Sequence, residues 1–209
     1  MENADFDLWA SSYDEDVSAS DSNDEYPFAG YKQVVNDVYG KVIAKAPCKV
    51  LDIGIGTGKL AAKLHANGCE VVGIDFSAKM LEAAAEKMQG ARLIPHDFTQ
   101  GLPQELAGQK FDFIISTYAL HHLGDSEKHR LISSAMDFLR EDGMILIGDV
   151  SFENHDMMRE SKERSGGLWD DEEHYFVHAD FVASLSADYI SSFRQHSHCG
   201  GVLEIRRRQ

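Results

Sequence analysis

The sequence predicts a doubly wound α/β domain with a mostly parallel, seven-stranded sheet that ends in a C-terminal antiparallel hairpin. Two observations lead to this fold class. Five short, predominantly apolar runs alternate with segments of helical spacing between residues 47 and 150. Two further β-like runs follow each other near the end of the chain. The 209 residues suit one domain of this kind and leave little for a second.

The five apolar runs are expected to form the parallel strands. They lack the apolar–polar alternation of a strand that has one face in water. Strands of this composition are buried on both faces, so helices should cover both sides of the sheet. In chain order the runs are 50–53, 70–74, 91–94, 111–116 and 144–150.

The core helices are predicted from their apolar spacing and from the residues that start and stop them. Proline cannot continue a helix, glycine commonly follows a helix end, and serine is a favoured N-cap. The expected helices are 31–46, ended by Pro47; 59–66, stopped by Gly68; 77–88, capped by Ser77 and stopped by Gly90; and 126–139.

The two ends of the chain lie outside this alternation. Near the N-terminus, four apolar residues have the spacing of one helix face. They are Phe6, Trp9, Ala10 and Tyr13. Residues 18–25 are small, polar and acidic, so we expect a loop there. At the C-terminus, the runs 190–196 and 202–206 should form a hairpin joined across Gly200 and Gly201.

A glycine-rich turn follows the first strand and opens the next helix. It reads Asp52-Ile53-Gly54-Ile55-Gly56-Thr57-Gly58-Lys59. Glycines let a backbone turn tightly and approach a ligand closely. A dinucleotide-binding loop needs a glycine where this chain has Lys59, and a phosphate loop needs a glycine in place of Ile53. Neither phosphate-binding pattern therefore fits.

The D-x-G-x-G-x-G pattern of residues 52–58 resembles the first motif of class I S-adenosylmethionine-dependent methyltransferases. The resemblance implies a Rossmann-like methyltransferase fold, in which this loop wraps the methionine and ribose parts of a cofactor without phosphates. It implies cofactor contacts by Asp52, Gly54, Gly56, Thr57 and Gly58. The alternative is a tight strand–helix turn that binds nothing.

Three later segments match the same family in order and spacing. Each follows the carboxyl end of a predicted strand, where ligands bind in sheets of this type. The resemblance implies Asp75 at the ribose hydroxyls, Phe76 and Met80 beside the adenosine, Asp97 at the adenine amino group with its neighbours His96 and Phe98, and Thr117 near the transferred methyl group. Helix capping by Asp75, a solvated loop position for Asp97, and core packing of Phe76 and Met80 are the alternatives.

The N-terminal pattern Phe6-Asp7-x-Trp9-Ala10-x-x-Tyr13-Asp14 resembles the helix that closes over the cofactor in small-molecule methyltransferases of the quinone-biosynthesis type and their YrrT-like relatives. The resemblance then covers most of the chain and implies one methyltransferase domain over residues 1–209. Its expected parts are N-terminal lid helices at 1–46, a cofactor-binding core at 47–150, a lid insert at 151–180, and a terminal helix end and hairpin at 181–209.

The family implies in-line methyl transfer, in which the protein mainly positions the partners and excludes water. His121 follows the fourth strand and could accept a proton near neutral pH, and a packed histidine is the alternative. Tyr13 could hydrogen-bond the cofactor or acceptor, or could anchor the lid helix. His174 and His178 could share a helix face, but a metal would need a third ligand, so no metal is expected.

The acidic residues are unevenly placed. The formal net charge is −15, and residues 1–30 hold 9 acids without a Lys or Arg. Residues 151–180 hold 9 acids and 3 bases, so these two segments carry the whole excess. Nucleic-acid backbones and anionic membranes are disfavoured as partners. We hypothesise that the two segments favour neutral or cationic molecules at the pocket entrance.

A small-molecule methyl acceptor is therefore the expected substrate. An RNA- or protein-directed methyltransferase and a non-catalytic binder of S-adenosylmethionine or S-adenosylhomocysteine remain open alternatives. The 3 cysteines form no C-x-x-C pair, and the acidic N-terminus lacks an apolar signal region. No apolar run is long enough to span a membrane. These features predict a cytoplasmic protein, and the sequence leaves its oligomeric state open.

Overall fold

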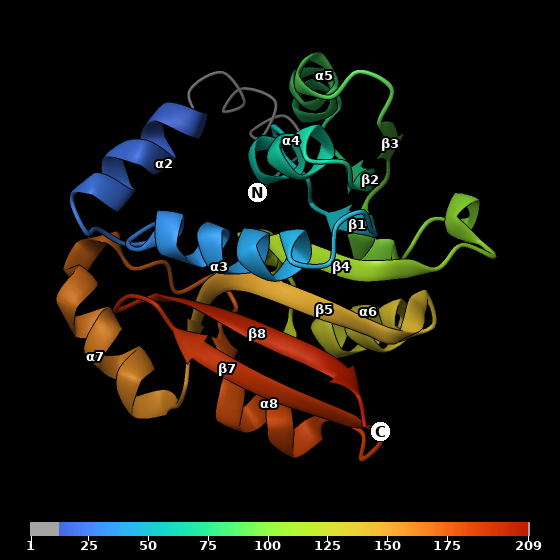
Figure 1. Ribbon diagram of the computed structural model, residues 1–209. Helices are drawn as coiled ribbons and strands as arrows, with labels where there is room; N and C mark the ends of the chain where they lie inside the picture. The colour runs from blue at the N-terminus through green and yellow to red at the C-terminus, as the bar shows by residue number, and fades with distance from the viewer. Residues whose placement is uncertain (1–12, 209) are drawn as a thin grey trace.

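The computed structural model describes residues 13–208, and an eight-stranded sheet forms the centre of this part of the chain (Figure 1). Seven strands lie in the order β3-β2-β1-β4-β5-β8-β7, and the short β6 pairs with β5 outside this path. The strands are β1 Lys49–Ile53, β2 Glu70–Asp75, β3 Arg92–Pro95, β4 Phe111–Thr117, β5 Leu139–Phe152, β6 Phe176–Val177, β7 Tyr189–Gln195 and β8 Gly200–Arg207.

The pairing directions confirm the predicted fold class. Strands β1 to β5 pair in parallel, whereas β8 runs antiparallel to both β5 and β7. The predicted hairpin therefore forms, although Gly200 and Gly201 are the first residues of β8 rather than its turn. Gly201 lies under the Phe193 ring, where a Cβ would come within 2.4 Å of that ring. These glycines thus permit close strand packing and do not make the turn.

Helices cover both faces of the sheet, as its apolar strands require. Two separate apolar cores result, one beneath α3, α4 and α5 and the other beneath α6 and α8 (Figure 1). The helices are α2 Tyr13–Ser22, α3 Tyr31–Ile43, α4 Lys59–Ala66, α5 Ala78–Lys87, α6 Asp125–Met136, α7 His155–Ser165 and α8 His178–Ser184. Short 3₁₀ turns are η1 Phe98–Gln100, η2 Gln104–Leu106, η3 Leu120–His122 and η4 Gly166–Leu168.

Several boundary predictions were wrong. The helix expected over 31–46 ends at Ile43, before the proline. The helix expected to reach Leu139 ends at Met136, and Leu139 pairs with Phe111 as the first residue of β5. The spacing of apolar residues continued past the true end, so sheet pairing rather than periodicity sets this boundary. Residues 18–22, expected in a loop, belong to α2, where Val17 is buried against the core.

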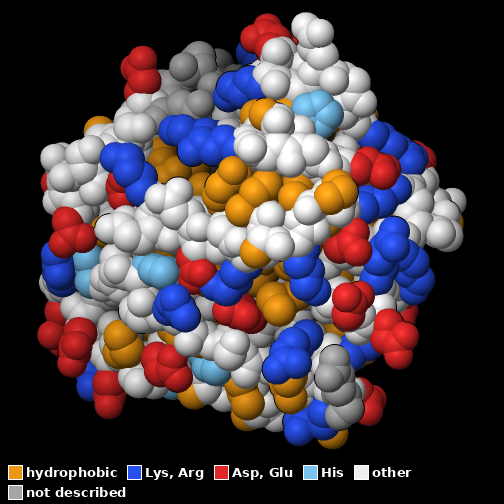
Figure 2. Space-filling view, in the orientation of Figure 1, with side chains coloured by type: hydrophobic (Ala, Val, Ile, Leu, Met, Phe, Trp, Pro, Cys, Tyr) orange, Lys and Arg blue, Asp and Glu red, His pale blue; other side chains and the backbone are white. Residues whose placement is uncertain are grey.

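The register of the parallel strands brings their carboxyl ends to one edge of the sheet. Ile53 pairs with Ile74, Asp52 with Ile115, and Thr117 with Gly148. The residues that follow β1, β2 and β4 must therefore lie together at this edge. Helix α7 follows β5 at this end of the sheet, and its acidic and basic side chains gather at the left of the molecule in Figure 2.

The glycine turn after β1 offers a stability test with a matched pair. Gly54 and Gly56 both have positive φ angles, of 71° and 53°. A Cβ on Gly54 would lie 2.5 Å from the Ala119 Cβ, whereas a Cβ on Gly56 would meet nothing within 4 Å. We expect Gly56→Ala to cost about 1–2 kcal/mol of unfolding free energy through backbone strain.

Gly54→Ala should cost about 1–3 kcal/mol more than Gly56→Ala, because overpacking adds to the same strain. Urea unfolding followed by circular dichroism measures both values. Equal losses for the two variants would contradict the close approach of the turn to Ala119.

Candidate active site

A cavity of about 300 Å³ lies at the carboxyl edge of the sheet. The turns after β1, β2 and β4 line it on one side, and segments 26–31 and 168–175 line it on the other. Ten of the residues predicted from sequence lie in its wall. They are Asp52, Gly54, Gly56, Thr57, Asp75, Phe76, Met80, Phe98, Thr117 and His121.

The remaining predicted residues lie elsewhere. Gly58 caps α4 with a φ of 72° and is not part of the cavity wall. The His96 ring contacts the Gly101 carbonyl at 2.9 Å, and Asp97 accepts from the Thr99 N–H and caps η1. Tyr13 begins α2, but its side chain is outside the described residues, as are Phe6, Trp9 and Ala10.

Asp75 holds the glycine turn in place. Its Oδ2 accepts a hydrogen bond from the Gly56 N–H at 2.8 Å, and its Oδ1 accepts from the Ser77 N–H at 2.9 Å. Ser77 in turn caps α5 by accepting from the Met80 N–H, as predicted. The carboxylate of Asp75 is therefore fixed at the point where β1 and β2 both open into the cavity.

Asp52 is a buried acid in the cavity wall without a compensating contact. Its side chain is 2% exposed, and Oδ1 has no hydrogen-bond partner among the described residues. Burial, followed by the nearby charge of Asp75, raises the pKa of Asp52 to about 8. Such a group fits a ligand that brings a hydrogen-bond donor or a positive charge. The open space at Gly56 leaves room for that ligand beside the turn.

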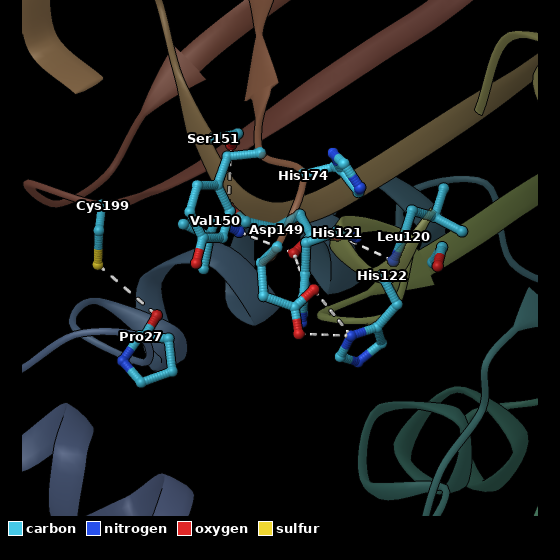
Figure 3. Close-up of polar contacts among 12 residues, drawn as sticks. Pro27, Leu120, His121, His122, Asp149, Val150, Ser151, His174 and Cys199 are labelled. Atoms are coloured by element: carbon cyan, nitrogen blue, oxygen red, sulfur yellow. Dashed lines mark hydrogen bonds and ion pairs between the residues drawn. The ribbon is translucent and has the colours of Figure 1, made fainter. Parts of the chain in front are cut away.

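His121 is held by Asp149, which comes from β5. The His121 Nδ1 lies 2.5 Å from Asp149 Oδ1 (Figure 3). Asp149 is fully buried, and its carboxylate also accepts from the N–H groups of Leu120, His121 and Val150. This network fixes the ring of His121 and leaves Nε2 as the nitrogen that can exchange a proton in the cavity.

The two side chains change each other's pKa. Burial favours the neutral ring of His121, but the charge of Asp149 and its hydrogen bond outweigh burial and raise the pKa of His121 above 6.5. Burial also opposes ionisation of Asp149, but His121 and the backbone donor of Val150 lower the pKa of Asp149 below 3.8. The arrangement is therefore a histidine of increased basicity supported by a carboxylate.

Residues 169–175, called the strap below, run past His121 and its neighbour His122. Glu173 Oε1 lies 2.9 Å from His122 Nδ1, and the His174 N–H donates to the His121 carbonyl at 2.8 Å. The Lys128 ammonium, in a side chain that is 2% exposed, donates to the His174 carbonyl. Backbone and buried side-chain contacts together thus hold the strap against η3.

The sequence did not predict that Glu173 joins His121 and His122 in one cluster. Among the described residues, His121, His122 and Glu173 bring one possible ligand atom each within 4.8 Å of one another. Each already has a hydrogen-bond partner on the protein. The pair predicted to share a helix face does not do so, because α8 begins at His178 and His174 precedes β6.

Aromatic rings join two distant parts of the chain above the cavity. Tyr26 stacks on Trp169 with ring centroids 5.3 Å apart, and its hydroxyl bonds that of Tyr175. Arg164 of α7 pairs with Asp24 nearby. The segment before α3 and the strap therefore form one continuous wall.

Comparison with known proteins identifies the family. A family model described as a methyltransferase domain matches residues 50–143. An uncharacterized methyltransferase from Geobacillus thermodenitrificans is 38% identical over 209 residues, covering 95% of this chain and 94% of that protein. The chain belongs to the class I S-adenosylmethionine-dependent methyltransferases.

Solved structures share the fold of this methyltransferase. DhpI in complex with SAH aligns with a TM-score of 0.72 at 17% identity, covering 98% of this chain and 94% of DhpI. Magnesium protoporphyrin IX methyltransferase from Synechocystis PCC 6803, with bound SAM, aligns with a TM-score of 0.64 at 20% identity, covering 87% and 81%. Each described helix of the methyltransferase is too short or too polar to cross a membrane.

Several functional candidates in this methyltransferase escaped sequence reasoning. Asp149 was assigned only to a strand, yet an acid inside a run that is buried on both faces is itself a signal. Glu173 and Lys128 carried no signal, because their contacts depend on the path of the strap. Tyr26 was likewise hidden in an acidic segment between helices.

Proposed function

We propose that this methyltransferase transfers a methyl group from S-adenosylmethionine to a small-molecule acceptor that loses a proton to His121. The observation that carries the proposal is that His121, held by the buried Asp149, lies in the same cavity wall as the glycine turn and Asp75. Two structural neighbours named for small-molecule or natural-product acceptors, magnesium protoporphyrin IX methyltransferase and plantazolicin methyltransferase, support this class of acceptor.

The cofactor fits the residues present. When bound, S-adenosylmethionine supplies an electrophilic methyl group on its sulfonium and carries an ammonium group at its amino-acid end. The unpartnered Oδ1 of Asp52 would accept from that ammonium group, and Asp75 would accept from the ribose hydroxyls. Gly54, Gly56 and Thr57 would line the turn around it, with Phe76, Met80 and Phe98 as the apolar wall.

We propose that Asp97, next to His96, accepts a hydrogen bond from the adenine amino group, although neither residue lines the cavity wall. Gly58 would contribute through the backbone shape of the turn. Thr117 would border the reacting methyl group, because it lies in the cavity at the end of β4.

His121 is proposed as the general base. Asp149 fixes Nδ1, so Nε2 accepts the acceptor's proton while the buried carboxylate stabilises the charged ring. The protein otherwise orients the acceptor and excludes water. Residues 1–46 and 151–180 are proposed as the lid segments of a single domain over 1–209, with 47–150 as core and 181–209 as hairpin end. Tyr13 would act from the first of these segments.

Charge bears on the acceptor. The net charge of −15 disfavours nucleic acid, and residues 1–30 and 151–180 carry that excess. We propose a cytoplasmic location, which the three free, buried cysteines support. No metal is assigned a role in this mechanism, because each group of the His121 cluster has a protein partner.

Labelled methyl transfer tests the proposal. The protein is incubated with S-adenosylmethionine labelled in the methyl group and a cell metabolite extract, before and after macromolecules are removed. Label in a small product after their removal is the expected result. Label only in protein or RNA would support the alternative acceptors. Cofactor binding without any labelled product would support a non-catalytic binder, and no binding at millimolar cofactor would refute the proposal.

We expect cofactor binding to be coupled to loss of a proton from Asp52. The free protein holds Asp52 largely protonated at pH 6–7, because its pKa is about 8. A bound ammonium favours the carboxylate, so binding releases one proton and the affinity rises about tenfold per pH unit in this range. Calorimetry of S-adenosylmethionine in buffers of different ionisation enthalpy measures the released proton. Asp52→Asn should remove both effects, and an unchanged pH dependence in that variant would contradict the assignment.

A further inference from the structure

Leu168 is an apolar side chain that the fold leaves exposed beside the candidate active site. Among the described residues, the exposed large hydrophobic side chains are Leu168, at 62%, and Val182, at 45%. Leu168 lies in the wall of the cavity, whereas Val182 lies on α8 away from it. Ligand pockets are lined predominantly by hydrophobic and aromatic side chains, so the place of Leu168 in the cavity wall is what sets it apart from Val182.

The turn that carries Leu168 is closely packed at one end only. Gly166 has a φ of 54°, and a Cβ added at Gly166 or Gly167 would meet nothing within 4 Å. The start of η4 therefore has open space beside it. The following residue, Trp169, is anchored by its stacking on Tyr26 and by the Tyr175 ring at 4.8 Å. Leu168 thus lies between two glycines with open space beside them and a tryptophan that is fixed by ring contacts.

The wall that Leu168 completes is aromatic and has few cations. Tyr26, Phe28, Tyr118 and Tyr175 all line the same cavity. Among the described lining residues, Lys59 is the sole Lys or Arg side chain. Its ammonium lies 5.8 Å from the centre of the Tyr31 ring. An acidic acceptor would find little positive charge here, whereas a flat apolar body would bury its surface against the rings.

We propose that Leu168 is a specificity-determining residue that packs onto an apolar, uncharged body of the methyl acceptor. This inference rests on the proposed function and adds the chemical class of the acceptor. The reacting group would lie toward His121, and the apolar body would fill the space between the tyrosines and Leu168. Burying a leucine against such a body corresponds to a binding gain of about tenfold to a hundredfold.

The test uses N-phenyl-1-naphthylamine, a neutral aromatic probe that fluoresces in apolar sites. It is titrated into the full-length protein with saturating S-adenosylhomocysteine. Leu168→Ala should weaken probe binding about tenfold, whereas Leu168→Met should keep it within about twofold. Val182→Ala, the matched exposed control, should bind like the original protein. The anionic analogue 8-anilino-1-naphthalenesulfonate, which has the same ring system with an added sulfonate, should bind at least about tenfold more weakly than the neutral probe.

Three results would each overturn the inference. They are equal probe binding by Leu168→Ala and the original protein, an equal loss in Val182→Ala, and tight binding of 8-anilino-1-naphthalenesulfonate. Calorimetry with S-adenosylhomocysteine separates this failure from that of the proposed function. Normal affinity in the original protein and in Leu168→Ala leaves the methyltransferase site intact, whereas absent binding in the original protein refutes the proposed function itself.

Discussion

His121→Gln should reduce methyl transfer to the identified acceptor by about 10²–10⁴-fold, the usual contribution of a general base. The variant loses the basic Nε2 but keeps a polar side chain beside Asp149. Its affinity for S-adenosylhomocysteine should stay unchanged. His129→Gln is the matched control, because His129 lies on α6 and packs on Phe181 outside this cavity.

The pH profile separates a base from a packed histidine. The rate should rise with pH as His121 loses its proton, with a midpoint above 6.5 because its pKa is raised. Asp149→Asn removes the charge that raises this pKa, so the midpoint should move to lower pH while the maximal rate falls. NMR titration of the imidazole measures the same shift without an acceptor. Full activity in His121→Gln would refute the assigned role.

Asp75→Ala should weaken S-adenosylmethionine binding by at least about 10²-fold. The variant removes a charged acceptor for two ribose hydroxyls, each bond being worth about 1.5–3 kcal/mol. It also removes the acceptor of the hydrogen bond that the Gly56 N–H donates to Asp75 Oδ2 at 2.8 Å. Calorimetry measures the dissociation constant.

Glu82→Gln is the control for Asp75→Ala. Glu82 is an exposed acid on the nearby α5, and its replacement changes the net charge by the same amount. Its cofactor affinity should equal that of the original protein. A loss of cofactor affinity of less than about threefold in Asp75→Ala would contradict the assignment of Asp75 to the ribose hydroxyls. Thermal melting of both variants tests whether unfolding causes any loss.

The sequence predicts the core of this fold well because local signals and tertiary packing agree there. The helix over 59–66 has its predicted bounds, and Ser77 caps α5 as expected. The end of α6 was missed because the apolar spacing of the helix runs on into Leu139, which β4 recruits as a strand residue. Such pairing depends on distant residues and leaves no local signal.

The candidate site likewise has residues that the sequence predicts and residues that it does not. The glycine turn, Asp75 and His121 follow strands, and the fold class alone brings strand ends together. Asp149 and Glu173 act through side chains from two other segments, 28 and 51 residues from the histidines they bind. The paths of β5 and of the strap decide where the side chains of Asp149 and Glu173 point. The spacing of residues in the sequence does not predict these paths.

The wall shared by Tyr26, Trp169 and Tyr175 has a consequence for protein engineering. Two stretches that lie 140 to 149 residues apart in the chain pack as one unit, tied also by Arg164 and Asp24. A chimera that takes only the insert from a relative would lose the partners of its aromatic rings. Exchanging acceptor preference between relatives therefore requires that residues 20–30 and 151–180 be transplanted together.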